Sequence, residues 1–244
     1  MAKLVIPEGL ANLHVREEVL RDKAISLIVA DPRLILHLNI IEHAMDLAYI
    51  LRQFPTDDED FKVLQLMGMR LFNAFGASVN LALSGYGQNS ALVMRDILET
   101  VFLLDLFKSD RPALERWRFA DKKAYEKEFS PVRVREALDK RDGFSERKRA
   151  AIYKLFSELA GHPTMKSMYM MRPDKDGDAH IGPFIERPML EAIITEMGKL
   201  AIQAGELLDA FFPSDWSDGA ATRVAFAKQK KLWTSEFFSH AKRK

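Results

Sequence analysis

The sequence predicts an all-α protein, a single bundle of about eight helices with one short hairpin or ordered loop near residues 166–184. Apolar residues recur at spacings of three and four along most of the 244 residues. Asp-Pro, Ser-Pro and glycine signals interrupt this pattern at helix-length intervals. We see no alternation of strand and helix patterns, no repeat and no linker. One helical domain over residues 1–244 is therefore expected.

Four helices are expected in the N-terminal half, over residues 15–30, 32–54, 61–83 and 88–107. Asp31 followed by Pro32 is typical of an N-cap with proline at the first helical position. Pro55 closes the second helix, and the stretch 56–60 supplies a cap and an acidic first turn to the third. The fourth helix follows Gly85 and Gly87 and is apolar almost all round.

In the C-terminal half, prolines mark three helix starts, at Pro112, Pro131 and Pro188. Another helix is expected from Ser145 to Leu159, where Gly161 takes the position of a C′ glycine. Residues 166–184 form the hairpin or ordered loop, and 188–211 carry the clearest apolar stripe. The last helix covers 220–238 and leads into a basic tail, so the C-terminal helix and tail occupy 213–244.

The composition excludes several classes of protein. The formal net charge is +1, which gives no overall field for nucleic acid, and the absence of cysteine removes disulfides and thiol chemistry. The apolar runs are too short for a signal peptide or a membrane span. We expect a soluble, cytoplasmic protein with no membrane partner.

Motif searches predict no metal and no cofactor. No histidine follows a glutamate at the Glu-x-x-His spacing, and His-x-x-x-His is absent. Asp174, Asp176 and Asp178 alternate like a calcium loop, but the glycine stands fourth and Ile185 stands twelfth, so a solvated turn is favoured. Phosphate-binding glycine motifs and Gly-x-Ser-x-Gly are also absent.

Charged residues interrupt the apolar helix that follows Gly87. Arg95 and Glu99 are four residues apart and share a face, with Asp96 beside them. Apolar residues bracket this patch at both ends, which favours partial burial. The preferred interpretation is an ion pair that fixes helix register. The alternative is a pocket that holds a small polar or anionic ligand on Arg95, with Glu99 as orienting group or base.

A second set of candidates lies near residue 160. Tyr153 and Ser157 share a helix face, and His162 follows at the helix C-terminus, where capping is its preferred role. If the fold joins them to the first patch, the candidate catalytic residues are Arg95, Glu99, Tyr153, Ser157 and His162.

Two other charged regions are predicted to be solvated. The stretch 111–149 is rich in charge and is interpreted as helical surface. The C-terminus is basic, with aromatic residues interleaved, and nucleic acid is the alternative partner there. The basic residues after Thr222 are Arg223, Lys228, Lys230, Lys231, Lys242, Arg243 and Lys244.

The order of motifs resembles the bacterial all-helical proteins of the DUF5677-type family. The motifs are Gly85-Tyr86, Arg95-x-x-x-Glu99, Arg116 to Phe119, Tyr153-x-x-x-Ser157 and His162-Pro163, within a region of about 61–212. The resemblance implies an all-helical fold and no established activity. Helical proteins of this look are also similar to HEPN domains, whose ribonuclease motif is Arg-x(4–6)-His. That motif is absent, because His37 follows Arg33 after three residues and His180 follows Arg172 after seven.

The sequence therefore favours a homodimeric binding or interaction module. The alternative is an enzyme or ligand binder, such as a hydrolase acting on RNA or a nucleotide, that uses the Arg, Glu, Tyr and His candidates. A second alternative is nucleic-acid binding through the basic C-terminus.

Overall fold

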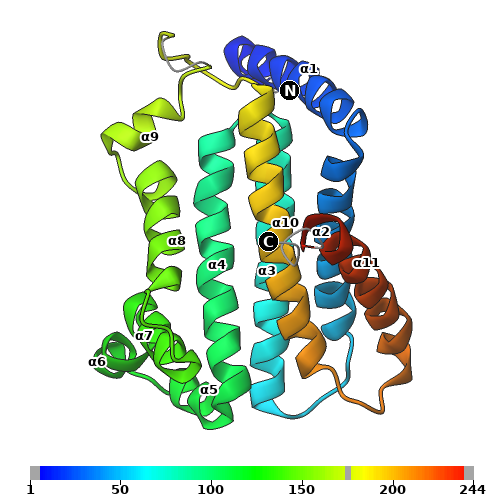
Figure 1. The fold of residues 1–244 in the computed structure, drawn as a ribbon, viewed down its shortest axis with the longest axis vertical. Coiled ribbons are helices and arrows are strands. Elements are labelled where there is room, and N and C mark those ends of the chain that lie inside the picture. The colour runs from blue at the N-terminus through cyan, green and yellow to red at the C-terminus, as the bar shows by residue number, and fades with distance from the viewer. Residues whose placement is uncertain (1–5, 174–176, 239–244) are drawn as a thin grey trace, which may run out of the picture.

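The protein is all-α, as the periodicity predicts. The structure, a computed structural model, describes residues 6–173 and 177–238. It is 80% helical, and the described ranges contain no strand (Figure 1).

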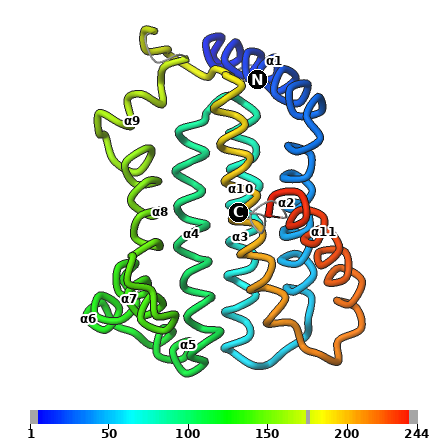
Figure 2. Tube along the Cα trace, viewed as in Figure 1, coloured from blue at the N-terminus to red at the C-terminus, as the bar shows by residue number. Residues whose placement is uncertain are grey.

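Four long helices form the central bundle: α2 (Pro32–Leu51), α3 (Glu59–Leu83), α4 (Gly87–Ser109) and α10 (Arg187–Phe211). α3 packs between α2 and α4, and α10 packs against all three, although more than seventy residues separate it from α4 (Figure 2). The stripe predicted for α10 is buried throughout, from Leu190 to Phe211. Burial of these faces supplies the main favourable term in folding.

The predicted caps explain where two of these helices begin. The Asp31 carboxylate accepts a hydrogen bond from the Arg33 amide at 2.9 Å, and Asp58 does the same for Asp60 at 2.8 Å. Each bond satisfies one of the free amides of a first helical turn. Both helix starts are therefore fixed by local chemistry that the sequence displays.

The remaining elements flank the bundle on either side (Figure 1). α1 (Glu8–Val29) crosses one end, and η3 (Ser217–Gly219) leads into α11 (Ala220–Phe238), which packs on α2. On the other side of α4 lie the remaining elements: α5 (Arg111–Arg118), α6 (Lys122–Ala124), the π-helix η1 (Tyr125–Phe129), α7 (Pro131–Asp142), α8 (Lys148–Phe156), the π-helix η2 (Ser157–Gly161) and α9 (Met165–Tyr169).

Two local predictions need correction, the start of α1 and the role of Gly161. α1 begins at Glu8, directly after Pro7, and not at Val15. Of the region predicted as a hairpin or ordered loop, the described residues 166–173 and 177–184 contain no strand and open with α9, which Thr164 caps through a reciprocal pair of bonds with Ser167. The calcium-like turn at Asp174 and Asp176 lies outside the described residues. Gly161 is no left-handed C′ glycine, because it sits inside η2.

α2 is long and apolar enough to cross a membrane by length and composition, alone among the described helices. Its residues face several neighbours, and α3, α10 and α11 pack against it. Eight of them are buried, from Leu34 to Leu51, including His37. Such burial on several sides is typical of a helix that lies in a protein core.

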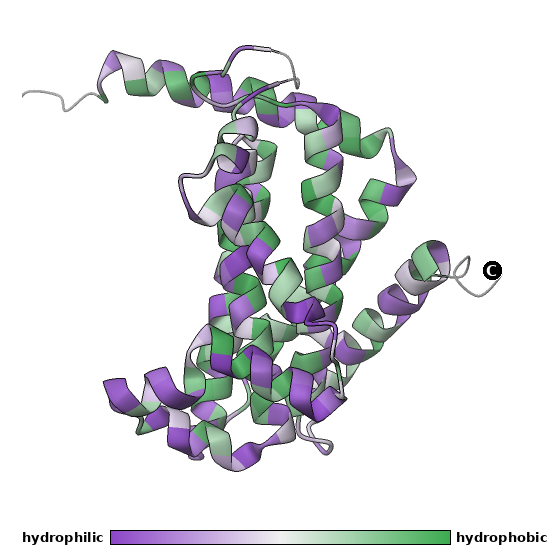
Figure 3. Ribbon diagram, turned by 60° about the vertical axis from the view of Figure 1, so that its left-hand side comes forward, coloured by the Kyte–Doolittle hydropathy of each residue, from purple (hydrophilic) through white to green (hydrophobic). Residues whose placement is uncertain are grey.

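α1 is the least covered of the long helices. Only Ala24 and Ile28 are buried, and its first turns extend beyond the bundle, where hydrophobic residues alternate with polar ones (Figure 3). Its exposed apolar residues are Leu10, Val15, Val19, Ile25 and Val29.

Candidate functional site

The turn before α4 is held by close backbone contact. Gly85 has φ +88°, and its carbonyl accepts a hydrogen bond from the Phe184 amide at 3.1 Å. A Cβ on Gly85 would lie 2.8 Å from the Phe184 nitrogen, so only glycine fits. The next residue, Tyr86, donates its hydroxyl to Glu17 of α1 at 2.7 Å. Burial and this bond raise the pKa of Tyr86 to about 12.

The charged patch of α4 is half-buried, as the bracketing apolar residues predict. The Arg95 and Glu99 side chains keep 23% and 32% of their exposure, and Arg95 Nε lies 3.3 Å from Glu99 Oε1. Asp96 forms its ion pair with Arg70 of α3. The patch therefore connects α4 to a neighbouring helix and does not simply face water.

Tyr153 joins the patch from α8. Arg95 Nη2 donates to the Tyr153 hydroxyl oxygen at 2.5 Å, and the guanidinium carbon lies 4.8 Å from the ring centre. Ser157 is buried, and its hydroxyl donates to the Tyr153 carbonyl at 2.9 Å. Three candidates, Arg95, Glu99 and Tyr153, thus lie together, and Ser157 holds the backbone of the helix that supplies one of them.

His162 does not join this cluster through its side chain. The residue is exposed, and its amide donates to the Ser157 carbonyl at 3.0 Å, which closes η2. Its side chain lines a separate hollow of about 280 Å³ with Gln88 and Asn89. In the described part of the chain, no hydrogen bond or ion pair joins the His162 side chain to Arg95, Glu99 or Tyr153.

Arg135 of α7 also packs against Tyr153, and sequence reasoning missed it. Its guanidinium carbon lies 3.8 Å from the ring centre, and the residue is only 9% exposed. The prediction that 111–149 is solvated is therefore wrong at this position. A signal was present, because Arg135 stands between Val134 and Leu138, which mark the apolar face of α7.

Beside the patch lies a pocket of about 490 Å³, which we call the α3–α4 pocket. Ten of its lining residues are apolar or aromatic, namely Val63, Leu66, Met67, Phe102, Leu103, Trp117, Tyr125, Phe129, Pro131 and Val134. The four polar ones are Arg70, Asp96, Glu99 and Thr100. A more open hollow borders it and shares four of these residues, namely Leu66, Arg70, Asp96 and Glu99, while adding Arg95. The charged patch thus lies where the pocket meets the open hollow.

Both π-helical segments border this region. η1 supplies Tyr125 and Phe129 to the pocket. In η2, a Cβ on Gly161 would lie 2.7 Å from Arg95 Nη1, so the glycine lets the chain pass close to the guanidinium. π-helical turns often occur at functional sites. Here η1 forms part of the pocket lining, and η2 passes beside the Arg95 guanidinium.

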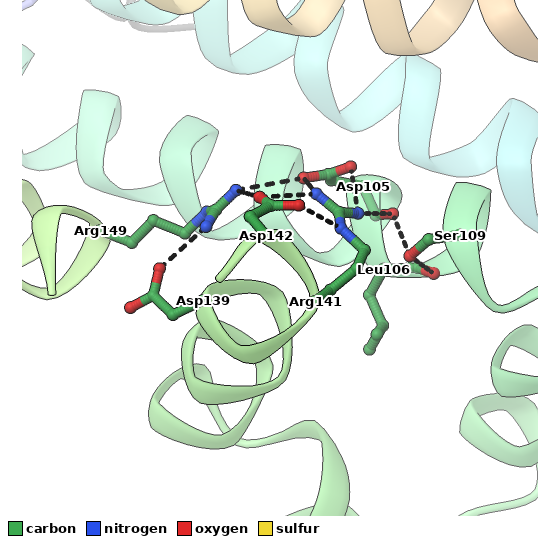
Figure 4. Close-up of polar contacts among 7 residues, drawn as sticks. All are labelled: Asp105, Leu106, Ser109, Asp139, Arg141, Asp142 and Arg149. Carbon is green, nitrogen blue, oxygen red and sulfur yellow. Dashed lines mark hydrogen bonds and ion pairs between the residues drawn. The ribbon is translucent and has the colours of Figure 1, made fainter. Parts of the chain in front are cut away.

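An ion-pair network fixes α7 and α8 against α4 (Figure 4). Arg141 forms two hydrogen bonds with the carboxylate of Asp105 of α4, at 2.8 and 3.0 Å. Arg149 of α8 binds Asp139 at 2.8 Å and also pairs with Asp142. Hydrogen bonds from Arg141 and then Arg149 hold the pKa of Asp142 well below its usual range. This network sets the position of α8, and so of Tyr153.

Other candidate chemistry finds less support. The described residues contain no group of three or more His, Asp or Glu side chains that could hold a metal ion. At the C-terminus, Arg223 pairs with Asp209 and Lys230 with Glu206, which neutralises part of the basic surface. Lys242, Arg243 and Lys244 lie outside the described residues, so nucleic-acid binding there stays a prediction.

Comparisons with family models, with curated proteins and with solved structures found no match to this chain. The resemblance to the DUF5677-type family therefore stays a prediction.

Proposed function

We propose that this protein is a binding module that holds a small apolar or amphipathic ligand in the α3–α4 pocket. The observation that supports this proposal is the pocket, which has a volume of about 490 Å³, a mostly apolar and aromatic wall and a few polar groups at its open side. Ligand pockets span about 300 to 1,000 Å³ and have this kind of lining. The apolar body of the ligand would contact Trp117 and Phe129, and its polar end would lie near Arg70 and Glu99.

This proposal is favoured over the hydrolase alternative by what the candidate catalytic residues contact. Ser157 donates to a backbone carbonyl, and Arg95 is engaged by both Glu99 and Tyr153. His162, the histidine among the candidate catalytic residues, lines a different hollow. A nucleophile and a base within hydrogen-bonding reach are what such chemistry requires.

Binding of the neutral dye Nile red tests the pocket. Leu66 is 60% exposed in the pocket wall, and Val224 of α11 is 68% exposed far from it in sequence, which makes it a matched control. We expect saturable binding by the wild type, at least tenfold weaker binding by Leu66→Asp, and unchanged binding by Val224→Asp. Equal loss in both variants, or no saturable binding by the wild type, would contradict the proposal.

We also propose that the module is a cytoplasmic homodimer of bacterial origin, in line with the resemblance. The exposed apolar residues of α1 support this, since Val15 and Val19 keep 65% and 64% of their exposure in the isolated chain. Light scattering after size exclusion should give about twice the chain mass of 27.9 kDa. Val15→Glu with Val19→Glu should halve that mass, whereas a wild-type monomer at micromolar concentration would exclude the dimer.

A further inference from the structure

Arg135 carries a buried positive charge that the described protein does not balance. Other shielded arginines have acidic partners: Arg149 has Asp139 at 2.8 Å, and Arg118 has Asp60 at 2.6 Å. Arg135 is more buried than either, at 9% exposure, yet no carboxylate of the described residues lies within ion-pair distance. Buried charges are costly unless they are paired, so this position is exceptional within the fold.

The N–H groups of Arg135 also lack acceptors. Its Nε and Nη1 are both buried without a hydrogen bond. Nε of Arg95 also makes no hydrogen bond, because its contact with Glu99 at 3.3 Å is an ion pair only. The ring of Tyr153, 3.8 Å away, attracts the guanidinium as a whole. A ring face does not accept N–H bonds that lie in the guanidinium plane, so the Nε–H and Nη1–H of Arg135 stay without an acceptor.

The charges around Tyr153 sum to an excess of one positive charge. Two guanidinium groups, Arg95 and Arg135, contact the ring or its hydroxyl, and Glu99 is the single carboxylate paired there. The nearby carboxylates of α7 are already used, because Asp139 and Asp142 bind Arg149 and Arg141 (Figure 4). No acidic group of this network is left to neutralise Arg135.

We propose that Arg135, Arg95 and Tyr153 form a binding site for an oxyanion, a phosphate or carboxylate group of a small molecule. Two or more oxygens on one anion match the fork of N–H donors that a guanidinium presents. Of the three residues Arg95 alone lines the open hollow, so the anion would reach Arg135 and Tyr153 from that side, past the Arg95 side chain. This site goes beyond the proposed function, since it needs no apolar ligand in the α3–α4 pocket and can be tested without one.

The test is thermal unfolding and calorimetric titration of the full chain with sodium phosphate, and separately with sodium acetate. Sodium chloride at matched ionic strength is the reference. Arg133 offers a matched control, because it stands on the same helix, is 56% exposed and pairs with Glu136. We expect a saturable rise in Tm and measurable heat for the wild type and for Arg133→Met. Arg135→Met should abolish both effects.

Removal of an unbalanced buried charge should also raise the Tm of Arg135→Met in chloride alone. If that variant fails to fold, Arg135→Lys keeps the charge without the fork and should bind at least fivefold more weakly. Response to phosphate alone or to acetate alone identifies the anion. Response to neither in the wild type, or a full response in Arg135→Met, would overturn the site, and Nile red binding by that variant should be unchanged.

Discussion

The indole N–H of Trp233 donates to Nδ1 of His37 over 2.8 Å, inside the contact between α11 and α2. His37 is 2% exposed and stacks on Phe237, with ring centres 4.3 Å apart. Because Nδ1 accepts this bond, the ring is neutral and carries its proton on Nε2. The docking of the last helix therefore depends on an uncharged histidine.

Stability should fall in mild acid because of His37. Burial, helped by the charges of Lys199 and Arg33, lowers its pKa from 6.5 to about 4. The unfolded chain binds this proton first, so the stabilisation is fully present above pH 6.5 and is lost as pH falls toward 4. The loss attributable to His37 should reach about 2 kcal/mol at pH 5.

Urea unfolding at pH 7.5 and pH 5 measures this effect. His37→Asn keeps an acceptor but removes the titration, and it should show a smaller loss of stability between the two pH values. His14, whose side chain is 65% exposed, supplies the control variant His14→Asn, which should keep the wild-type loss. An equal loss in all three proteins would refute the assignment.

A methyl group at Gly198 should destabilise the same contact. A Cβ there would lie 2.5 Å from His37 Nδ1, in the tight packing of α10 on α2. We expect Gly198→Ala to lower the free energy of unfolding by about 1 to 3 kcal/mol, as overpacking does. Gly9→Ala on α1 meets nothing within 4 Å and should be neutral or slightly stabilising. Equal stability of the two variants in urea would show that α10 can shift.

Loss of Asp139 should destabilise the junction of α7 and α8. The carboxylate is 12% exposed and binds Arg149, which is 15% exposed. Asp139→Ala leaves Arg149 with Asp142 as its close partner, and we expect a loss of about 2 to 4 kcal/mol in urea. Glu136→Ala, at 59% exposure on the same helix, should cost less than about 0.5 kcal/mol. Similar losses in the two variants would mean that the ion-pair network contributes little to the free energy of unfolding.

Gly161→Ala should displace Arg95 while leaving the fold intact. The new Cβ would lie 2.7 Å from Nη1, at the far end of a flexible side chain that can move. The hydrogen bond to Tyr153 would then be lost. The Nε–H signal of Arg95 in a ¹H–¹⁵N spectrum should shift, with a change in Tm of only a few degrees. Gly9→Ala should leave that signal in place, and an unmoved signal in Gly161→Ala would show that the two groups do not touch.

The sequence predicts those parts of the fold whose signals are local. The apolar stripe of α10 lies on one side, so its period alone identifies the buried residues. Asp31 and Asp58 are N-caps and mark where α2 and α3 begin. The stripe on α2 is less clear, because neighbours cover several of its sides and His37 becomes a core residue. Partial burial of Arg95 and Glu99 follows from the apolar turns that bracket them.

The rest of the candidate site depends on which distant helices meet. The contact of Arg95 with Tyr153 joins residues 58 apart, and no pattern in either helix requires it. Arg135 stands in a charged stretch that resembles solvated surface, and its burial arises from packing of α7 against α4 and α8. The sequence predicts a cap at Gly161 because a π-turn has no sequence signature as simple as that of a C′ glycine.

The two π-helical segments also bear on how this chain tolerates changes in length. A π-turn holds one residue more than an α-turn, as the bond from the His162 amide to the Ser157 carbonyl shows. Deletion of one residue within 157–161 would restore ordinary helical spacing there, so the helix itself need not break. Each residue of an α-helix turns the chain by about 100°, however, so the segment that follows would be rotated away from Arg95. The single extra residue in η2 thus sets the rotation of the chain that follows it relative to Arg95.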